Sequence, residues 1–401
     1  MKEGWEYNKL EDICTIVGRI GFRGYTKADL VESPNDGAIT LSPSNIINGE
    51  LDFSNCTYIS WNKYNESPEI MLEIGDVVLV KTASIGKCAV VKKLPHKATL
   101  NPQFVVLKGI TGEPNFIGYY LKSPVAQTII KQMAGGVAIP TLSQKKLGTM
   151  LIPSSPLSEQ QAIVDYLDSA FAKIDAMKAN AEKALNEAKA LFQASLKEML
   201  EPKEGWEEKK LEDICTHIVD CPHNTPRKVN YPTLYPCIRT SEIKEGKIKW
   251  NSMQYLDEEE YNVRTTRIKP MANDIVYGRE GSYGDAVLLP EGYNFSLGQR
   301  TMLFRPDTKS VLPKFLHYSV ISTYVYEQAK AKNSGCGVGH VNVKDIKLFI
   351  IGIPKTLSEQ QTIVTTLDTL KSKVDRLLEN YDKISQECDA LKQAILRQVF
   401  E

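Results

Sequence analysis

Two stretches of the chain share an apolar spacing that alternates between four and three residues. The first runs through Ile163, Leu167, Ala170, Ile174, Met177, Ala181, Ala184, Ala188, Leu191 and Ser195. The second runs through Ile363, Leu367, Leu370, Val374, Leu377, Tyr381, Ile384, Cys388, Leu391 and Ile395, each position offset by 200. A sustained period of 3.5 residues is typical of a coiled-coil seam. We therefore predict long helices over residues 156–203 and 356–401.

The first seam is rich in alanine and the second is bulky, which suits two helices that pack closely against each other. Because a whole domain separates them in the chain, we expect an antiparallel pair about 60 Å long. Ser158 and Ser358 are predicted to cap the helices, with Gln161 and Gln361 completing capping boxes. The alternative is that each helix lies on its own domain or dimerises between chains.

The segments before the helices, residues 1–155 and 204–355, have the pattern of mixed α/β domains, which we call arms 1 and 2. Predicted strands are short apolar or β-branched runs at 76–80, 88–91 and 104–107, and at 274–277, 286–289 and 301–304. Predicted helices span 116–133 and 314–332. The expected fold is α+β, with two pseudo-twofold-related mixed α/β domains joined by an antiparallel two-helix coiled coil.

The halves of the chain are internal repeats. The segments 3–15 and 204–216 agree at eleven of 13 positions, and 157–168 and 357–368 agree at nine of 12. Between these segments the arms diverge. A duplicated chain is expected to fold into two like units, and the backbone of duplex DNA has the same twofold symmetry.

Composition indicates a folded protein with no membrane span and does not identify a ligand. Hydrophobic content is 42% and net charge is zero; arm 1 has 16 basic and 14 acidic residues, and arm 2 has 21 and 19. No apolar run reaches membrane-spanning length and the first residues are polar, so we expect a cytoplasmic protein. The eight cysteines form no C-x-x-C pair, and the cluster His217, Cys221 and His223 lacks a fourth ligand, so no metal site is predicted.

Each arm has a loop between two predicted strands that combines cations, hydroxyls and glycines, which suits close approach to phosphates and base edges. A second candidate lies earlier in each arm. The predicted DNA-binding residues are Ser42, Ser44, Lys81, Thr82, Ser84, Lys87, Arg239, Ser241, Arg279, Ser282, Tyr283 and Arg300. Arginine is the commonest bidentate partner of guanine, which favours Arg239, Arg279 and Arg300.

Motifs for chemistry are incomplete. Asn101-Pro-Gln-Phe104 resembles an adenine methyltransferase motif, but glutamine replaces the second proline and no glycine-rich cofactor loop precedes it. Ser84-Ile-Gly-Lys-Cys88 lacks the first glycine and the final hydroxyl of a P-loop. No nucleophile, base and orienting group can be assembled from the five histidines. We predict no catalytic residue and no cofactor.

The divergent arms, the two alike helices and the Leu-Ser-Glu-Gln-Gln starts at 157 and 357 together resemble Type I restriction–modification DNA specificity subunits. So do the arm openings at Gly4-Trp5 and Gly205-Trp206. The resemblance covers essentially the whole chain. It implies that each arm is a target recognition domain for one half of a split double-stranded DNA site, and that the length of the coiled coil sets the gap between the halves.

The resemblance also implies partners. Two methyltransferase subunits, which methylate adenine with S-adenosylmethionine, would dock on the helices near Gln160, Gln161, Gln360 and Gln361, and two restriction subunits would join them. Because arm 2 has seven arginines and arm 1 has two, the half-sites should differ and the full site should be asymmetric. The alternative is a stand-alone bivalent DNA-binding or DNA-spacing protein without methyltransferase partners.

Overall fold

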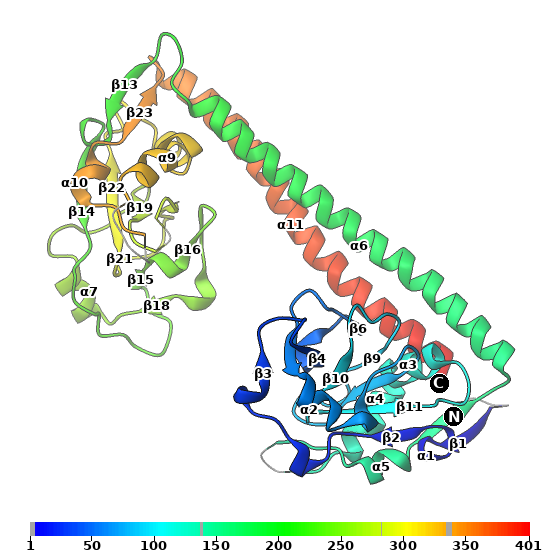
Figure 1. The fold of residues 1–401 in the computed structure, drawn as a ribbon. Coiled ribbons are helices and arrows are strands. Elements are labelled where there is room, and N and C mark those ends of the chain that lie inside the picture. Colours follow the sequence, from blue (N-terminus) through cyan, green and yellow to red (C-terminus); the bar gives the residue numbers. More distant parts are fainter. Residues whose placement is uncertain (1–4, 137–138, 282, 334–338) are drawn as a thin grey trace. The chain divides into compact units, whose positions relative to one another are not determined.

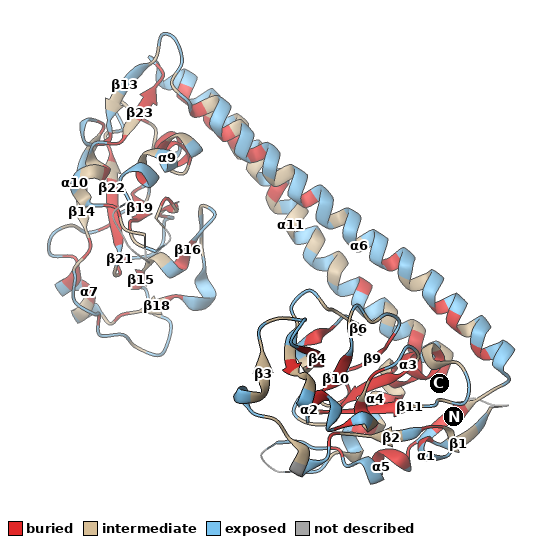
Figure 2. Cartoon of the chain, viewed as in Figure 1, coloured by how far each residue is buried: buried red, intermediate tan, exposed pale blue. Residues whose placement is uncertain are grey.

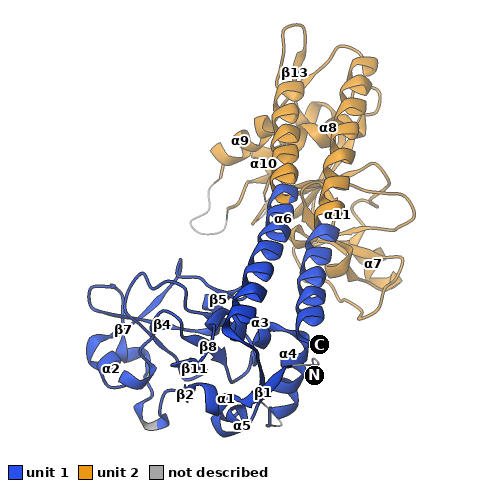
Figure 3. Ribbon diagram, turned by 90° about the vertical axis from the view of Figure 1, so that its right-hand side faces the viewer, with its two compact units in different colours: residues 1–181, 382–401 blue, residues 182–381 orange. Residues whose placement is uncertain are grey.

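The computed structural model describes residues 5–136, 139–281, 283–333 and 339–401, without the side chain of Phe22. The chain divides into two compact units, residues 1–181 with 382–401 and residues 182–381 (Figure 3). Each unit therefore contains one arm and parts of the two long helices, α6 (Leu157–Leu200) and α11 (Leu357–Phe400) (Figure 1). None of the described helices is both long and apolar enough to cross a membrane.

Arm 1 is built on two sheets. One is antiparallel, in the order β2 (Thr15–Val17), β11 (Phe104–Lys108), β8 (Val77–Val80) and β9 (Cys88–Val90). The other has the order β10 (Ala98–Leu100), β4 (Gly37–Leu41), β7 (Thr57–Ser60) and β3 (Leu30–Val31), with β10 and β4 parallel. The paired strands β1 (Glu6–Lys9) and β12 (Leu151–Ser154) lead into and out of the arm, and β5 (Ile46–Ile47) with β6 (Glu50–Leu51) forms a hairpin.

Arm 2 repeats this plan. Its main sheet has the order β14 (Cys215–Asp220), β22 (Thr301–Pro306), β19 (Ile275–Gly278) and β20 (Ala286–Leu288). Its second sheet is shorter: β18 (Gln254–Tyr255), β15 (Pro236–Ile238) and β21 (Ser296–Leu297), with β15 and β21 parallel. The strands β13 (Glu207–Lys210) and β23 (Ile350–Ile353) pair at the base, and β16 (Ile243–Lys244) with β17 (Lys247–Ile248) forms the hairpin. The predicted strand runs and mixed α/β arms are confirmed.

The helices of the arms are short. Arm 1 contains α1 (Leu10–Ile13), α2 (Trp61–Asn65), α3 (Pro114–Lys122), α4 (Pro124–Met133) and α5 (Gln144–Gly148). Arm 2 contains α7 (Glu258–Arg264), α8 (Pro313–Val320), α9 (Thr323–Ala331) and α10 (Val343–Lys347). The single helices predicted over 116–133 and 314–332 are therefore wrong. Each is two helices, because Ser123 and Ser322 accept hydrogen bonds from backbone amides three residues later and so cap a second helix.

Within each unit the long helices are antiparallel, as predicted. In the first unit the Cys388 thiol lies 3.8 Å from the Ile174 carbonyl oxygen, and Lys392 lies 2.6 Å from Asp175. In the second, Phe192 of α6 faces Lys371 of α11. The alternative in which each helix packs only beside its own arm is wrong.

The cores of the arms extend onto both helices. The apolar core of the first unit includes Leu167 of α6 with Leu396 and Phe400 of α11. The core of the second includes Leu367 of α11 with Leu196 of α6. Figure 2 shows buried positions recurring along both helices and filling the central strands of each arm. The start of one helix and the end of the other thus complete each arm.

The predicted seam is only partly correct. Met177 and Leu191 are 59% exposed, and Leu391 is also exposed. The side chains buried beyond residue 174 in place of the predicted ones are Leu185, Phe192, Leu196, Leu200, Leu396 and Phe400. A helix of 3.6 residues per turn rotates by about 20° per heptad against a 3.5-residue repeat, so the buried stripe moves off the predicted positions.

The predicted capping boxes are wrong. Both helices begin at residues 157 and 357, so Ser158 and Ser358 lie inside the first turn. In α11 the hydroxyl of Thr356 accepts the amide of Glu359 and is the cap. Gln161 and Gln361 instead donate to side chains one turn later, Asp165 and Thr365.

Candidate DNA interface

In arm 1 four loops meet at one end of the sheets: residues 41–45, 81–87, 101–103 and 139–142. Backbone hydrogen bonds join them: Asn101 to Leu41 (3.0 Å), Lys81 to Gln103 (2.7 Å), Leu142 to Lys81 (2.8 Å) and Ala83 to Pro140 (3.2 Å). Both predicted DNA-binding loops belong to this cluster, and the 101–103 turn lies between them. We call these four loops the loop edge of arm 1.

Arm 2 assembles the same edge from residues 238–242, 279–285, 298–300 and 339–342, of which residue 282 is not described. The corresponding hydrogen bonds are Gly298 to Ile238 (2.7 Å), Arg279 to Arg300 (3.0 Å), Val341 to Arg279 (3.0 Å) and Gly281 to Gly339 (2.9 Å). The repeat therefore conserves a backbone arrangement at the end of each arm, although the loop sequences differ.

Both edges contain a non-glycine residue in the left-handed backbone region, Ala83 with φ +64° and Arg300 with φ +69°. Such a conformation costs roughly 1 kcal/mol or more and persists where the surrounding structure imposes it, often at binding sites. In arm 2 it presents a charged side chain from the β21–β22 turn.

The predicted DNA-binding residues of arm 1 differ in how exposed their side chains are and in the contacts that they make. Lys81 is half-buried, and this burial lowers the pKa of its ammonium group. Thr82 forms a β-bridge with Thr141. Ser84 and Lys87 are exposed on the same loop. In the neighbouring loop the Ser42 hydroxyl lies 2.7 Å from the Ser44 hydroxyl, and Ser44 is exposed.

In arm 2 two of the favoured arginines have internal carboxylate partners. Arg279 has a side chain only 9% exposed and donates to Asp220 at 2.9 Å. Arg239 forms a bidentate pair with the buried Glu242, at 2.9 Å from Nε and 2.5 Å from Nη2. The Arg239 pair lies within the 238–242 loop, and the Arg279 pair joins the 279–285 loop to the end of β14.

The other predicted residues of arm 2 lie nearer the surface. Arg300 is 53% exposed and pairs with Glu280 at 3.2 Å. Ser241 is exposed and donates to Glu242. Tyr283 stacks on Tyr326 with ring centroids 5.8 Å apart. Ser282 lies outside the described residues. The edge thus leaves Arg300 as the accessible arginine among the three favoured.

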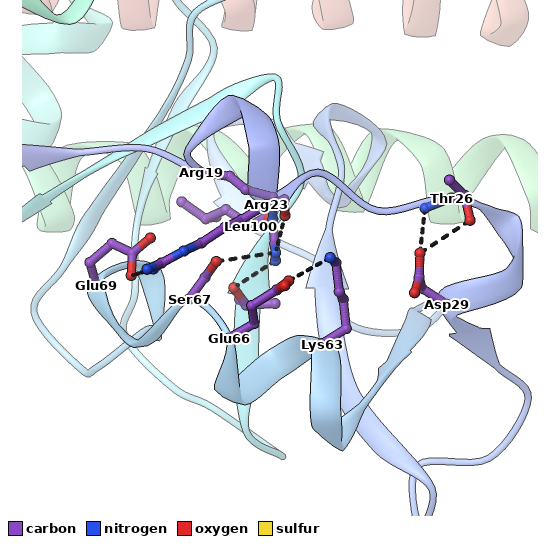
Figure 4. Close-up of polar contacts among 10 residues, drawn as sticks. Arg19, Arg23, Thr26, Asp29, Lys63, Glu66, Ser67, Glu69 and Leu100 are labelled. Carbon is purple, nitrogen blue, oxygen red and sulfur yellow. Dashed lines mark hydrogen bonds and ion pairs between the residues drawn. The ribbon is translucent and has the colours of Figure 1, made fainter.

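Sequence reasoning missed a buried arginine beneath each edge. In arm 1, Arg19 donates to the Leu100 carbonyl at the end of β10 and contacts Ser67 (Figure 4). Its burial lowers the pKa of the guanidinium group. In arm 2, Arg264 of α7 donates to the Leu297 carbonyl at the end of β21. Neither arginine belongs to a recognisable motif; only its burial identifies it.

The predicted partner-binding glutamines divide into two kinds. Gln160 is buried: its carbonyl accepts the Glu113 amide at 2.9 Å and its amide donates to the Ser155 carbonyl at 2.8 Å. Gln360 is also buried: it accepts the Leu312 amide at 2.8 Å and donates to the Ser310 carbonyl of the arm at 3.0 Å. These two side chains therefore anchor each helix to its arm.

The repeated tryptophans also join each arm to the start of its long helix. Trp5 and Trp206 donate from their indole nitrogens to Glu159 and Glu359, each at 3.0 Å. Gln161 and Gln361 are exposed, next to the exposed Leu157 and Leu357. Much of the repeated motif is thus explained by arm-to-helix contacts, and its exposed members remain open to a partner.

A known protein family matches each half of the chain separately. The model of the Type I restriction modification DNA specificity domain matches residues 2–187 and again residues 203–386. The chain belongs to this family. Each match covers one arm and much of the helix that follows it, so this family member contains the domain twice.

Relatives of this family member include named specificity subunits. The chain is 24% identical to the Type I restriction enzyme EcoKI specificity subunit of Escherichia coli (strain K12), covering 100% of this chain and 89% of that one. It is 24% identical to the Escherichia coli EcoBI specificity subunit over 70% of this chain and 64% of that one.

Solved structures agree in fold. A chain from a structure on complex assembly and conformational transition of the type I R-M system has a TM-score of 0.73 at 18% identity, covering 100% of this chain and 98% of that one. The HsdS subunit from Thermoanaerobacter tengcongensis has a TM-score of 0.54 at 17% identity, covering 99% and 97%. The family fold is therefore that expected from the sequence.

Proposed function

We propose that this chain supplies the DNA sequence specificity of a Type I restriction–modification complex and contributes no catalytic group of its own. The observation that carries the proposal is the loop edge, which recurs in both arms with the same backbone hydrogen bonds and different side chains. A fixed scaffold with variable polar side chains suits recognition of different base sequences.

The target is a bipartite, asymmetric site in double-stranded DNA, with one half recognised by each arm. At the edge of arm 1 the accessible candidates are Ser44, Ser84 and Lys87. At the edge of arm 2 they are Ser241 and Arg300. Lysine and serine favour contacts with phosphates, whereas arginine pairs well with guanine, so the half-sites should differ.

The proposed partners are two S-adenosylmethionine-dependent adenine methyltransferase subunits and two restriction subunits. The proposed docking residues are the exposed Leu157 with Gln161 and Leu357 with Gln361, at the start of each long helix. A protein partner that covers them would remove the leucine side chains from water. The proposed recognition domains are residues 1–155 and 204–355, with the helices at 156–203 and 356–401 between and after them.

The test is selection of bound or methylated duplexes from a random DNA library, using the chain purified with its methyltransferase. We expect one asymmetric motif in two parts. Absence of any bipartite preference would contradict the proposal. Equal specificity without the methyltransferase would instead support the alternative of a stand-alone bivalent DNA-binding protein.

We further propose that helix length sets the gap between the two half-sites. Deleting residues 179–185 together with 379–385 removes one heptad from each helix and changes the phase of the remaining buried stripes by only about 20°. About 10 Å of helix is lost, which corresponds to roughly three base pairs. Library selection with this variant should yield the same half-sites with a shorter gap; an unchanged gap would contradict this part of the proposal.

A further inference from the structure

The internal repeat gives the long helices two ways to pair. The core of arm 1 takes Leu396 and Phe400 from the end of α11, and the core of arm 2 takes Leu196 and Leu200 from the end of α6. These apolar ends occupy equivalent positions of the repeat, with Leu200 of α6 at the position of Phe400 in α11. By the same contacts, α6 could therefore pair with α6 of a second copy of this chain, and α11 with α11.

One crossing point in the first unit distinguishes the two helices. The Lys392 ammonium nitrogen of α11 lies 5.3 Å from the centroid of the Phe171 ring of α6, and 2.6 Å from an oxygen of Asp175. The Phe171 ring also packs edge-on against Tyr119 of the arm, with centroids 5.5 Å apart. The lysine is thus held between an aromatic face and a carboxylate.

The second unit has an equivalent crossing. There the phenylalanine lies near the end of its helix and the lysine near the start of the other, the reverse of the first unit. Lys371 of α11 lies 5.7 Å from the Phe192 ring of α6 and 3.3 Å from Asp375. The Phe192 ring packs against Tyr318, with centroids 6.3 Å apart. Position 371 corresponds to 171 in the repeat, and 192 to 392. At both crossings, therefore, α6 supplies the phenylalanine and α11 the lysine.

We infer that these two crossings select the pairing of α6 with α11 and disfavour pairing of like helices between two copies of the chain. An α6–α6 pair would place Phe171 opposite Phe192 and lose both cation–π contacts. An α11–α11 pair would place Lys371 opposite Lys392, two like charges on side chains that are each only 22% exposed. Closure within one chain keeps both Lys371 and Lys392 on an aromatic ring.

A third contact also favours pairing of α6 with α11, but only weakly. Lys178 of α6 lies 3.4 Å from Asp389 of α11, which is 70% exposed. Pairing of α6 with α6 would place Lys178 near Lys189 instead. Exposed ion pairs contribute little, so the selection rests on the two phenylalanine–lysine crossings.

The test exchanges one crossing in the full-length chain. The variant Phe192→Lys with Lys371→Phe turns the crossing of the second unit into a copy of that in the first, with an aromatic residue four positions before Asp375. Pairing within the chain stays complementary. Each helix, however, now has one phenylalanine and one lysine, so pairing with a like helix is complementary as well.

Two differently tagged copies of the chain are co-expressed, one tag is captured, and copurification of the other is measured with light scattering of the product. We expect the wild type to be monomeric. The exchanged variant should raise copurification by roughly tenfold or more. The mirror variant, Phe171→Lys with Lys392→Phe, should do the same and provides a second test if the first folds poorly.

The control combines all four substitutions, which restores one residue type to each helix. It should return to the monomer, although it has more substitutions than either dimeric variant. The inference is overturned if both exchanged variants stay monomeric like the wild type, or if the fourfold variant dimerises as strongly as they do.

Discussion

The two arms share a backbone plan and differ in how polar side chains stabilise it. At the edge of arm 2, carboxylates hold arginines, as in Arg279 with Asp220 and Arg239 with Glu242. The edge of arm 1 has lysines and hydroxyls in the same loops. The repeat therefore preserves the hydrogen bonds between loops, while the side chains on those loops differ between the arms.

Most of the arginines in arm 2 are buried or paired with buried carboxylates. Arg264 and Arg279 are buried, and Arg239 and Arg305 pair with the buried carboxylates of Glu242 and Asp274. A count of arginines therefore overstates the capacity of this arm to contact DNA. The asymmetry of the predicted site rests on the few exposed side chains at each edge.

Substitution of the buried arginines should have the largest effect, and each substitution should affect one arm only. Arg19→Met leaves the Leu100 carbonyl without its charged donor, and Arg264→Met does the same to the Leu297 carbonyl. Each should lower stability by about 2–4 kcal/mol, because a buried acceptor loses its partner. Hydrogen exchange should accelerate in β10 for the first variant and in β21 for the second. Equal acceleration in both arms would contradict independent support of the edges.

A buried histidine should make arm 2 the more acid-sensitive. His317 lies in α8 with Nε2 3.1 Å from the Ala286 carbonyl, and burial lowers its pKa to about 4. The folded arm favours the neutral ring, so its stabilisation is full above the ordinary pKa of 6.5 and is lost as pH falls towards 4. At pH 5 the loss is about 2 kcal/mol.

Gly118 occupies the corresponding position of α3 in arm 1. Hydrogen exchange between pH 7 and 5 should therefore show loss of protection in arm 2 before arm 1. His317→Gln, which has no titrating group, should remove the difference. An unchanged pH profile in this variant would assign the acid sensitivity to other groups.

Substitution of Arg300 should affect specificity in one half-site. Arg300→Ala removes the exposed arginine of the arm 2 edge and leaves the internal pairs of Arg239 and Arg279 intact. If the side chain recognises guanine, discrimination at one base position should fall by about 1–3 kcal/mol. Library selection measures this, and the half-site of arm 1 serves as the internal control. A uniform loss at all positions would show that Arg300 contacts phosphate.

Lys87→Ala in arm 1 should have the smallest and least specific effect. A lysine on a phosphate contributes to affinity without selecting a base. Binding should weaken equally for all sequences, and the salt dependence of log K should fall by about one unit. Titrations at several salt concentrations measure the slope. An altered base preference would instead place Lys87 at a base edge.

Much of the fold followed from patterns in the chain. The repeats, the strand runs and the two long helices were predictable because each depends on local periodicity or on direct sequence agreement. The division at Ser123 and Ser322 was not foreseen. In arm 1 Pro124 is a signal of a new helix, because proline suits the first turn of a helix and breaks its interior. In arm 2 a serine within an apolar run gives only a weak signal of a new cap. The exact buried stripe also escaped prediction, because it depends on which side of each helix faces an arm.

The candidate DNA-binding loops were identified from composition, but not the roles of their side chains. Gln160 and Gln360 were assigned to partner binding, and their burial instead places them in the anchor between arm and helix. Arg279 was favoured as a bidentate partner of guanine, and in the structure it pairs with Asp220 of a strand 59 residues away in the chain. Such partners lie far apart in sequence.

By itself, the sequence determined that the chain is a duplicated α+β protein with paired helices and unlike arms, because repeats and apolar periods are properties of local order. Only the tertiary structure decided which polar residues face solvent and which phenylalanine and lysine meet at each crossing. Those outcomes depend on the desolvation and charge of groups brought together by folding, as Lys392 is with Phe171 and Asp175.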